Sequence, residues 1–266
     1  MADKRPVGVF DTGIGGFTSV REIQAAMPKE DIIYYGDTAN MPYGDRSAED
    51  IIHLTRQILD FMAAHQVKVV AVACNTISSF IDRCCGDYPF KVFSIVEAGA
   101  ACAARIADDC IGVIGTPVTA KSGVYERLIH SLRPDMKVVS AACPRLSYCI
   151  ENGMTAPYIV DPQLTEAIDG MAAKEKFFNL VLGCTHYPLI EDHLERLYPA
   201  ISLIDPAREQ AAELKEYLKE ERMQNLNGGN LSVYTSGDAA YYAICAAKFG
   251  VNSPCTIEKI SVATPL

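Results

Sequence analysis

Two short stretches decide the fold: Val69-Val70-Ala71-Val72-Ala73-Cys74-Asn75-Thr76 and Leu180-Val181-Leu182-Gly183-Cys184-Thr185-His186. Each begins with a run of apolar residues that is too short for a buried helix and rich in Val or Leu, which is typical of a central strand in a parallel sheet. Each run then passes through a cysteine into small polar residues. Because open α/β sheets bind ligands beyond the carboxyl ends of their strands, we expect both thiols to lie where small-molecule chemistry is done.

The same alternation of strand and helix patterns continues in both directions from these stretches. Strand-like apolar runs alternate with segments whose apolar residues recur every three or four positions, which predicts βαβ units on a mostly parallel sheet. We expect helices over residues 47–65, 118–132, 162–174 and 207–222.

The pattern is also duplicated. The run Val7-Gly8-Val9-Phe10-Asp11-Thr12-Gly13 is echoed by Ile111-Gly112-Val113-Ile114-Gly115-Thr116-Pro117, residues 31–35 by residues 136–140, and the first cysteine motif by the second. Each echo follows its original by roughly a hundred residues, and an ordered series of this kind is the mark of an internal repeat. The sequence therefore predicts two pseudo-symmetric, mostly parallel-sheet α/β domains that face each other across a central cleft, with one cysteine on each side.

The repeat also sets the expected domain limits. The chain should leave the first half near residues 96–99 and return to it near Asp205-Pro206. The residues after 205 predict a helix, a polar turn at 225–230, a strand at 231–235 and a final helix from Asp238. By its length this tail should pack on the first half. We therefore expect a discontinuous first domain, residues 1–97 and 206–266, and a second domain over residues 98–205.

The composition narrows the class of protein. The chain has 266 residues, 49% of them hydrophobic, which is ample for packed cores. Its formal net charge is -9 and no Lys/Arg cluster appears, so a nucleic-acid partner is not expected. The N-terminal residues lack the apolar region of a signal peptide, and no apolar stretch is long enough to span a bilayer. We expect a cytoplasmic protein with no membrane partner.

The cysteines are not expected to form disulfides or to bind a metal. Ten cysteines would predict a disulfide scaffold only in a small secreted chain. No pair has the Cys-x-x-Cys spacing of a zinc site, and Cys184 with His186 supplies only part of the ligand set that zinc needs.

A glycine-rich turn follows the first strand, in the run Phe10-Asp11-Thr12-Gly13-Ile14-Gly15-Gly16. It lacks the G-x-G-x-x-G pattern, and Asp11 would meet a pyrophosphate there, so a nucleotide is not expected. The N-terminus of the following helix could instead hold a small carboxylate, while Asp11 acts on a cation or a nearby thiol. Asp11 could also serve only as a helix cap.

Four motifs in order carry a resemblance to a known family: Asp11-Thr12-Gly13-x-Gly15-Gly16, Gly36-Asp37-Thr38 with Pro42-Tyr43-Gly44, Ala73-Cys74-Asn75-Thr76, and Gly183-Cys184-Thr185-His186-Tyr187-Pro188. Over essentially its whole length the chain resembles the glutamate racemases of the aspartate/glutamate racemase superfamily. The resemblance implies a cofactor-independent enzyme with one catalytic Cys on each of two facing α/β domains. It also implies glutamate as the small-molecule substrate, D-glutamate for bacterial peptidoglycan as the product, and a homodimer.

The resemblance further implies roles for single residues. By analogy with the family, Asp11 assists Cys74 and His186 assists Cys184. The family usually has Asp-Ser-Gly where this chain has Asp11-Thr12-Gly13, and its aspartate-preferring members commonly carry Glu where this chain has His186, so the His favours glutamate. The predicted substrate-binding residues are Asp11, Thr12, Pro42, Tyr43, Gly44, Cys74, Asn75, Thr76, Thr116, Thr119, Cys184, Thr185 and His186.

Elementary chemistry explains these residue types. Inverting a stereocentre by proton exchange needs a base on one face of Cα and an acid on the other, with the roles exchanged in reverse. A free thiol has a pKa of about 8.5, so modest electrostatic help makes one thiolate available while the other thiol stays protonated. No Lys stands in a pyridoxal-type setting, so donors such as Asn75, Thr76 and Thr185 would stabilise the carbanion.

Some assignments stay open at this stage. Thr116 and Thr119 could bind the distal carboxylate or could form an ordinary turn and helix cap. Asp37 and Glu151 could face either the cleft or solvent, and no role is assigned to them. Two other functions also fit the sequence: racemisation of aspartate or another acidic amino acid, and a non-catalytic amino-acid-binding regulatory protein with this fold.

Overall fold

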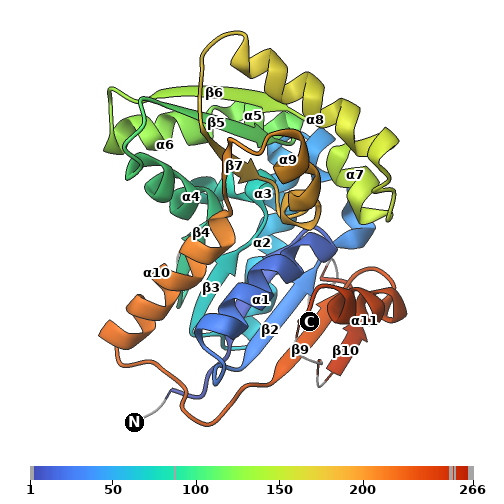
Figure 1. Cartoon of the computed structure of the whole chain (residues 1–266). Helices are drawn as coiled ribbons and strands as arrows, with labels where there is room; N and C mark the ends of the chain where they lie inside the picture. The colour runs from blue at the N-terminus through green and yellow to red at the C-terminus, as the bar shows by residue number, and fades with distance from the viewer. Residues whose placement is uncertain (1–2, 87, 252–253, 255, 263–266) are drawn as a thin grey trace.

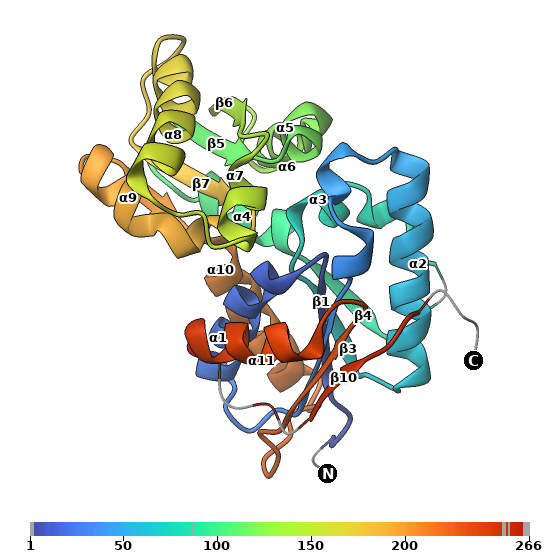
Figure 2. The ribbon, with the colours of Figure 1, turned by 90° about the vertical axis from the view of Figure 1, so that its right-hand side faces the viewer.

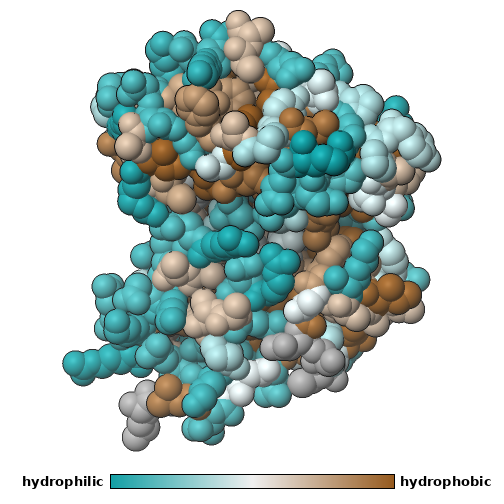
Figure 3. All heavy atoms as spheres, in the orientation of Figure 1, coloured by the Kyte–Doolittle hydropathy of each residue, from teal (hydrophilic) through white to brown (hydrophobic). Residues whose placement is uncertain are grey.

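The strands of the computed structural model, which describes residues 3–86, 88–251, 254 and 256–262, form two parallel sheets. The first sheet contains β1 (Val7–Asp11), β2 (Ile32–Gly36), β3 (Val69–Val72), β4 (Lys91–Ser94), β9 (Leu231–Thr235) and β10 (Thr256–Lys259). The second contains β5 (Cys110–Gly115), β6 (Lys137–Ala142), β7 (Asn179–Gly183) and β8 (Ser202–Ile204). The two sheets belong to two domains, one above the other in Figure 1, which appear as two lobes in Figure 3.

The strand order confirms the predicted duplication. Within the described residues the first sheet has the order β10-β9-β2-β1-β3-β4 and the second the order β6-β5-β7-β8. The four strands β2-β1-β3-β4 therefore correspond one by one to β6-β5-β7-β8. Cys74 follows β3 and Cys184 follows β7, so the two cysteines occupy equivalent places in two parallel-sheet α/β domains, as the sequence predicts.

Helices cover both faces of each sheet, an arrangement seen edge-on in Figure 2. On the first sheet, α1 (Phe17–Ala26), α10 (Pro206–Glu220) and α11 (Ala239–Lys248) share one apolar core, and α2 (Ala48–Ala64) and α3 (Asn75–Ser78) share the other. On the second, α4 (Ile95–Ala104) and α6 (Val124–Leu132) pack on one face, and α7 (Leu146–Glu151), α8 (Pro157–Ala172) and α9 (Glu191–Leu197) on the other.

The central strands are apolar throughout because both of their faces are buried. Successive side chains of a strand point to opposite faces. Accordingly Val69 and Ala71 enter the core beneath α1 and α10, whereas Val70 and Val72 enter the core beneath α2. This explains why β3 reads as a continuous apolar run and not as an alternating one.

Two of the predicted helices, α2 and α10, begin and end within two residues of the expected limits. The side chain of Ser47 caps α2 by accepting the N–H of Asp50, and Asp205 caps α10 by accepting the N–H of Ala207. Both caps satisfy amide groups that have no partner inside the helix.

Three other expectations about the elements were wrong. The helix predicted over residues 118–132 is two helices, α5 (Pro117–Ser122) and α6, because Gly123 has φ +60 and breaks the run. The helix predicted from residue 162 begins at Pro157, which takes the first helical position that proline favours, and Pro162 lies inside it. Strand β10 follows the helix expected to be the last element.

The chain connects the two sheets through helices. After β4 it enters α4, a helix that spans the predicted limit at residue 97 and packs against α10 and α6. After β8 it returns through α10, and β9 then pairs with β2 of the first sheet. The exact domain limits stay a prediction, and residues 1–2, 87, 252–253, 255 and 263–266 of the expected first domain lie outside the described residues. None of the helices in the described part of the chain is both long and apolar enough to cross a membrane.

Candidate active site

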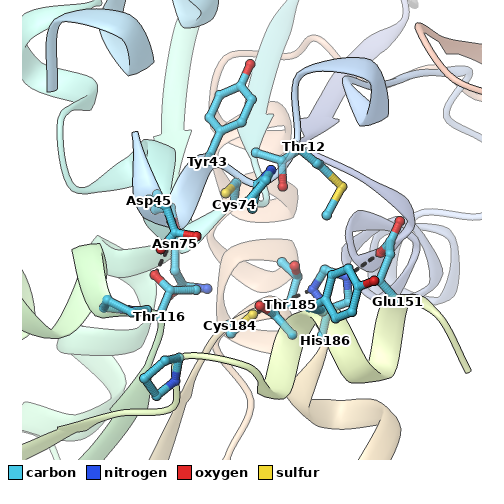
Figure 4. Close-up of a pocket in the computed structure, with 18 of the residues that line it drawn as sticks. Thr12, Tyr43, Asp45, Cys74, Asn75, Thr116, Glu151, Cys184, Thr185 and His186 are labelled. Atoms are coloured by element: carbon cyan, nitrogen blue, oxygen red, sulfur yellow. Dashed lines mark hydrogen bonds and ion pairs between the residues drawn. The ribbon is translucent and has the colours of Figure 1, made fainter. Parts of the chain in front are cut away.

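A cavity of about 400 Å³ lies between the two domains, a volume typical of small-molecule sites. Cys74 and Cys184 line it, and Figure 4 shows them on opposite sides. It forms where the carboxyl ends of the two sheets meet, which is where open α/β sheets bind ligands. The predicted site residues that line it are Thr12, Pro42, Tyr43, Gly44, Cys74, Asn75, Thr76, Thr116, Cys184, Thr185 and His186.

Two predicted residues, Asp11 and Thr119, are not among the residues that line the cavity. Asp11 is fully buried and accepts a hydrogen bond from the Thr185 hydroxyl, 3.1 Å away. The Thr119 hydroxyl is hydrogen-bonded to that of Thr116 at 3.0 Å, and its main-chain N–H donates to the same Thr116 oxygen. Both residues therefore support side chains that reach the cavity.

Cys74 has a carboxyl group as its neighbour. Asp11 ends β1 and Cys74 follows β3, and because these strands are adjacent and parallel their ends meet. The Asp11 carboxyl therefore lies close enough to influence the Cys74 thiol electrostatically. Burial raises the pKa of the Cys74 thiol well above its ordinary value, and the nearby Asp11 charge raises it further. Burial likewise raises the pKa of Asp11. The raised pKa keeps the Cys74 thiol protonated, with the Asp11 carboxyl nearby.

Cys184 has a histidine as its neighbour. The Sγ of Cys184 lies 3.6 Å from Nδ1 of His186, whose Nε2 contacts the Glu151 carboxylate in a buried ion pair. Burial opposes the charged imidazole, but the hydrogen bonds to Cys184 and Glu151 outweigh it and raise the pKa of His186 well above 6.5. A protonated His186 stabilises a thiolate at Cys184. The two cysteines therefore differ in their electrostatic surroundings.

Side chains that can form hydrogen bonds line the same cavity as the two thiols. The side-chain oxygen of Asn75 accepts the Tyr125 hydroxyl at 2.7 Å, and its Nδ2 is buried without a partner in the described structure. Asn75 lines the cavity, so this amide group can donate to a ligand. The hydroxyls of Thr76 and Thr116, one from each domain, lie 2.9 Å apart on the same wall.

The glycine-rich turn lets the two domains approach each other closely. A Cβ on Gly15 would lie 2.5 Å from Oγ1 of Thr185 and 2.7 Å from Cε1 of His186, closer than real atoms approach. The sequence predicts that this turn holds a small carboxylate. The structure places a carboxylate there, but it belongs to the protein: the N–H of Ile14 donates to Glu151 at 3.3 Å.

Glu151 is the main residue that sequence reasoning missed. It ends the short helix α7 of the second domain and not a strand, so the strand-end rule that found the cysteines does not reach it. The available signal was an acidic residue in the segment after β6, but the sequence does not show whether that residue faces the cleft or solvent. The other lining residues without a predicted role include Thr38, Met41, Asp45, Arg145, Ser147 and Tyr148.

The cysteines at described positions are free thiols. In the same part of the chain no three His, Cys, Asp or Glu side chains are grouped so that they could hold a metal ion.

Comparisons with known proteins agree with this geometry. The sequence matches the family model for Asp/Glu/Hydantoin racemase over residues 18–214. Glutamate racemase 2 of Caldanaerobacter subterraneus subsp. tengcongensis is 38% identical over 240 residues, which are 89% of this chain and 90% of that protein. The crystal structure of glutamate racemase from Francisella tularensis in complex with D-glutamate has a TM-score of 0.89 at 30% identity and covers 98% of each chain. A glutamate racemase isoform from Bacillus anthracis has a TM-score of 0.88 at 31% identity, with 97% of each chain covered. This chain belongs to the Asp/Glu/Hydantoin racemase family.

Proposed function

We propose that this protein is a glutamate racemase that interconverts L- and D-glutamate with two thiols and no cofactor. The observation that carries the proposal is the placement of Cys74 and Cys184 on opposite sides of one cavity, each with its own buried acid–base neighbour. The relatives named above are glutamate racemases, and one was solved with D-glutamate bound. Both findings support the substrate and the reaction.

The chemistry follows from the different surroundings of the two thiols. Cys184, as a thiolate beside the His186 imidazolium, takes the proton from one face of Cα, and the electron pair passes into the substrate carboxylate. Cys74 gives its thiol proton to the opposite face, which completes the inversion. One proton enters the protein and one leaves it. For the other enantiomer the roles are exchanged: Asp11 accepts the Cys74 proton to form the thiolate, and the His186 imidazolium gives its proton to Cys184, which then protonates the opposite face.

The unusual weakness of Cα–H as an acid requires strong stabilisation of the intermediate. The Nδ2 of Asn75 has no partner in the described structure and is buried at the cavity, so it is ready to donate to the substrate carboxylate. Thr76 supplies a further hydroxyl at the cavity, whereas the Thr185 hydroxyl already donates to Asp11. A single preorganised donor of this kind stabilises the transition state by roughly 3 kcal/mol, so several donors are needed to stabilise the carbanion.

The test is isotope exchange with matched cysteine variants. In deuterated water the wild-type protein should incorporate deuterium at Cα of the product made from L-glutamate, and L-aspartate should be turned over far more slowly. Cys74→Ser and Cys184→Ser should each abolish racemisation. Cys102 lies on α4 and does not line the cavity, so Cys102→Ser is the control and should retain activity. Racemisation that survives both site substitutions would disprove the proposal, and preference for aspartate would change the substrate.

Three further proposals rest on the resemblance to the family. The D-glutamate product would serve peptidoglycan synthesis, the protein would act in the cytoplasm, and it would form a homodimer. Light scattering coupled to size-exclusion chromatography tests the dimer, since a monomer mass at assay concentration would contradict it. Depletion of the protein in a cell that depends on it should be rescued by added D-glutamate.

A further inference from the structure

Tyr241 joins the first domain to the residue that supports His186. Its hydroxyl donates to the main-chain carbonyl of Glu151 at 2.5 Å. Tyr241 belongs to α11 of the first domain and Glu151 to α7 of the second, and Figure 1 shows these two helices at the same edge of the molecule.

Tyr241 contacts a main-chain carbonyl at the C-terminal end of α7. The last carbonyls of a helix have no partner inside it. Here the carbonyls of residues 148, 149 and 150 accept the N–H groups of residues 152, 154 and 153, in a turn where Gly153 has φ +71. In the described structure the partner of the Glu151 carbonyl is the Tyr241 hydroxyl.

Glu151 is thereby held at three points. Its carbonyl accepts from Tyr241, its Oε1 accepts from the main chain of Ile14, and its Oε2 contacts His186. The first two contacts come from the first domain. A six-residue helix has little stiffness of its own, so these contacts set where the carboxylate stands.

We propose that Tyr241 is a positioning residue for the acid–base pair of Cys184 and His186, acting through the main chain of Glu151. This inference rests on the proposed function, because it assigns Tyr241 a part in that reaction. It also makes the Cys184 half of the site depend on contact between the two domains. Catalysis of proton transfer is sensitive to displacements well below the size of an atom, so loss of one positioning hydrogen bond should be visible in the rate.

Tyr241 suits substitution because its ring lies at the surface. Tyr241 is 36% exposed, and Ile244 on the same helix is also exposed. Tyr241→Phe removes the hydroxyl and keeps the ring. The matched control is Tyr198→Phe, which removes a hydroxyl bonded to the Asp169 carboxylate at 2.8 Å on the outside of the second domain.

The first measurement is steady-state racemisation. We expect Tyr241→Phe to lower kcat roughly tenfold with KM unchanged within about twofold, and Tyr198→Phe to match the wild type. Because the two enantiomers have equal free energy, kcat/KM must fall equally in both directions. The primary deuterium isotope effect distinguishes the roles of the two thiols. It should rise for the α-deuterated enantiomer that Cys184 deprotonates, and it should stay unchanged for the enantiomer that Cys74 deprotonates.

The second measurement asks whether Tyr241 acts through Glu151. In a double-mutant cycle, adding Tyr241→Phe to Glu151→Gln should cost little further activity, since the positioned charge is already gone. Multiplicative losses would mean that Tyr241 acts by another route and would overturn the inference. So would a Tyr241→Phe variant that behaves like Tyr198→Phe.

A third measurement needs no activity. The charged groups facing His186 are Glu151, Cys184 and Asp11. If Tyr241 positions Glu151, its loss weakens the contact with His186, and NMR titration of the His186 ring should give a lower pKa in Tyr241→Phe than in the wild type. An unchanged His186 pKa overturns the inference even if the proposed function fails. If Cys74→Ser and Cys184→Ser both retain racemisation, the proposed function is wrong, and the inference about Tyr241 is then judged by the His186 titration alone.

Discussion

Glu151 and Ile14 form a hydrogen bond between the two domains: the Oε1 of Glu151 accepts the main-chain N–H of Ile14 at 3.3 Å. The other oxygen of the same carboxylate contacts His186, which in turn reaches Cys184. One carboxylate thus binds the glycine-rich turn of the first domain and the imidazole of the second. The carboxylate that pairs with His186 is therefore also held by the first domain.

The charge of Glu151 should matter more than its hydrogen bonds. Glu151→Gln keeps an oxygen for the Ile14 N–H but removes the negative charge that faces His186. We expect kcat to fall by roughly 10- to 100-fold, the size of a lost acid–base contribution, with little change in KM. Chiral chromatography of the product measures it. The exposed Glu195→Gln is the control, and a Glu151→Gln enzyme with wild-type kcat would contradict the assigned role.

The same contact should make stability depend on pH in a defined direction. The folded-state pKa of His186 is raised above 6.5, because its hydrogen bonds to Cys184 and Glu151 outweigh the opposing effect of burial. A raised pKa gives stability that is complete below pH 6.5 and is lost as the pH rises through the folded-state value. The wild type should therefore lose free energy of unfolding relative to Glu151→Gln as the pH rises from about 6.5. Urea unfolding of both proteins across this range measures it, and parallel curves would refute the prediction.

Gly15 should tolerate no side chain. A Cβ there would stand 2.5 Å from Oγ1 of Thr185 and 2.7 Å from Cε1 of His186, so either the turn or the second domain must move. We expect Gly15→Ala to lower kcat/KM by at least roughly 100-fold, since the displaced groups hold the reacting thiol. Gly170→Ala is the matched control: it lies in α8 with nothing within 4 Å and should gain up to about 1 kcal/mol of helix stability. An active Gly15→Ala enzyme would show that the domains need not approach this closely.

The fold and the cysteines could be predicted because they depend on local pattern. The apolar runs that form β3 and β7 each lead into a cysteine, and parallel strands bring their carboxyl ends to one edge, so the strand-end position and the internal repeat predict Cys74 and Cys184. The break between α5 and α6 could not be read from periodicity, because it rests on the positive φ of Gly123. The role of Glu151 could not be read either, because it arises when a short helix of one domain meets a turn of the other. Local pattern determines the elements, whereas contacts between domains determine the supporting residues of the site.

Arg145 should attract the substrate. It is exposed, and among the described residues that line the cavity it is the one Arg or Lys side chain. The chain carries a net charge of -9, which repels an acidic amino acid. We expect Arg145→Ala to raise KM several-fold and to weaken the dependence of kcat/KM on ionic strength, since salt screens an exposed cation. Arg127→Ala changes the net charge equally at an exposed position outside the cavity lining and should leave KM unchanged. Equal effects of the two variants would assign the attraction to net charge and not to Arg145.

Lys68 should stabilise the first domain without affecting the reaction. Its ammonium is fully buried and donates to Oε2 of Glu30 at 2.5 Å and to the carbonyls of Asp3 and Met223 at 3.0 and 2.7 Å. It directly precedes β3, at the opposite end of that strand from Cys74. Removing one partner of a buried ion pair leaves the other charge without compensation, at a cost of about 3–5 kcal/mol.

We therefore expect Lys68→Met to lower the free energy of unfolding by about that amount in urea titrations, while kcat of the folded fraction stays unchanged. The double substitution Lys68→Met with Glu30→Gln should recover part of the loss, since no uncompensated charge then remains. Lys219→Met, which breaks an exposed pair with Glu216, should cost less than about 1 kcal/mol. A Lys68→Met protein as stable as Lys219→Met would mean that solvent reaches Glu30 and that the buried Lys68–Glu30 pair does not stabilise the first domain.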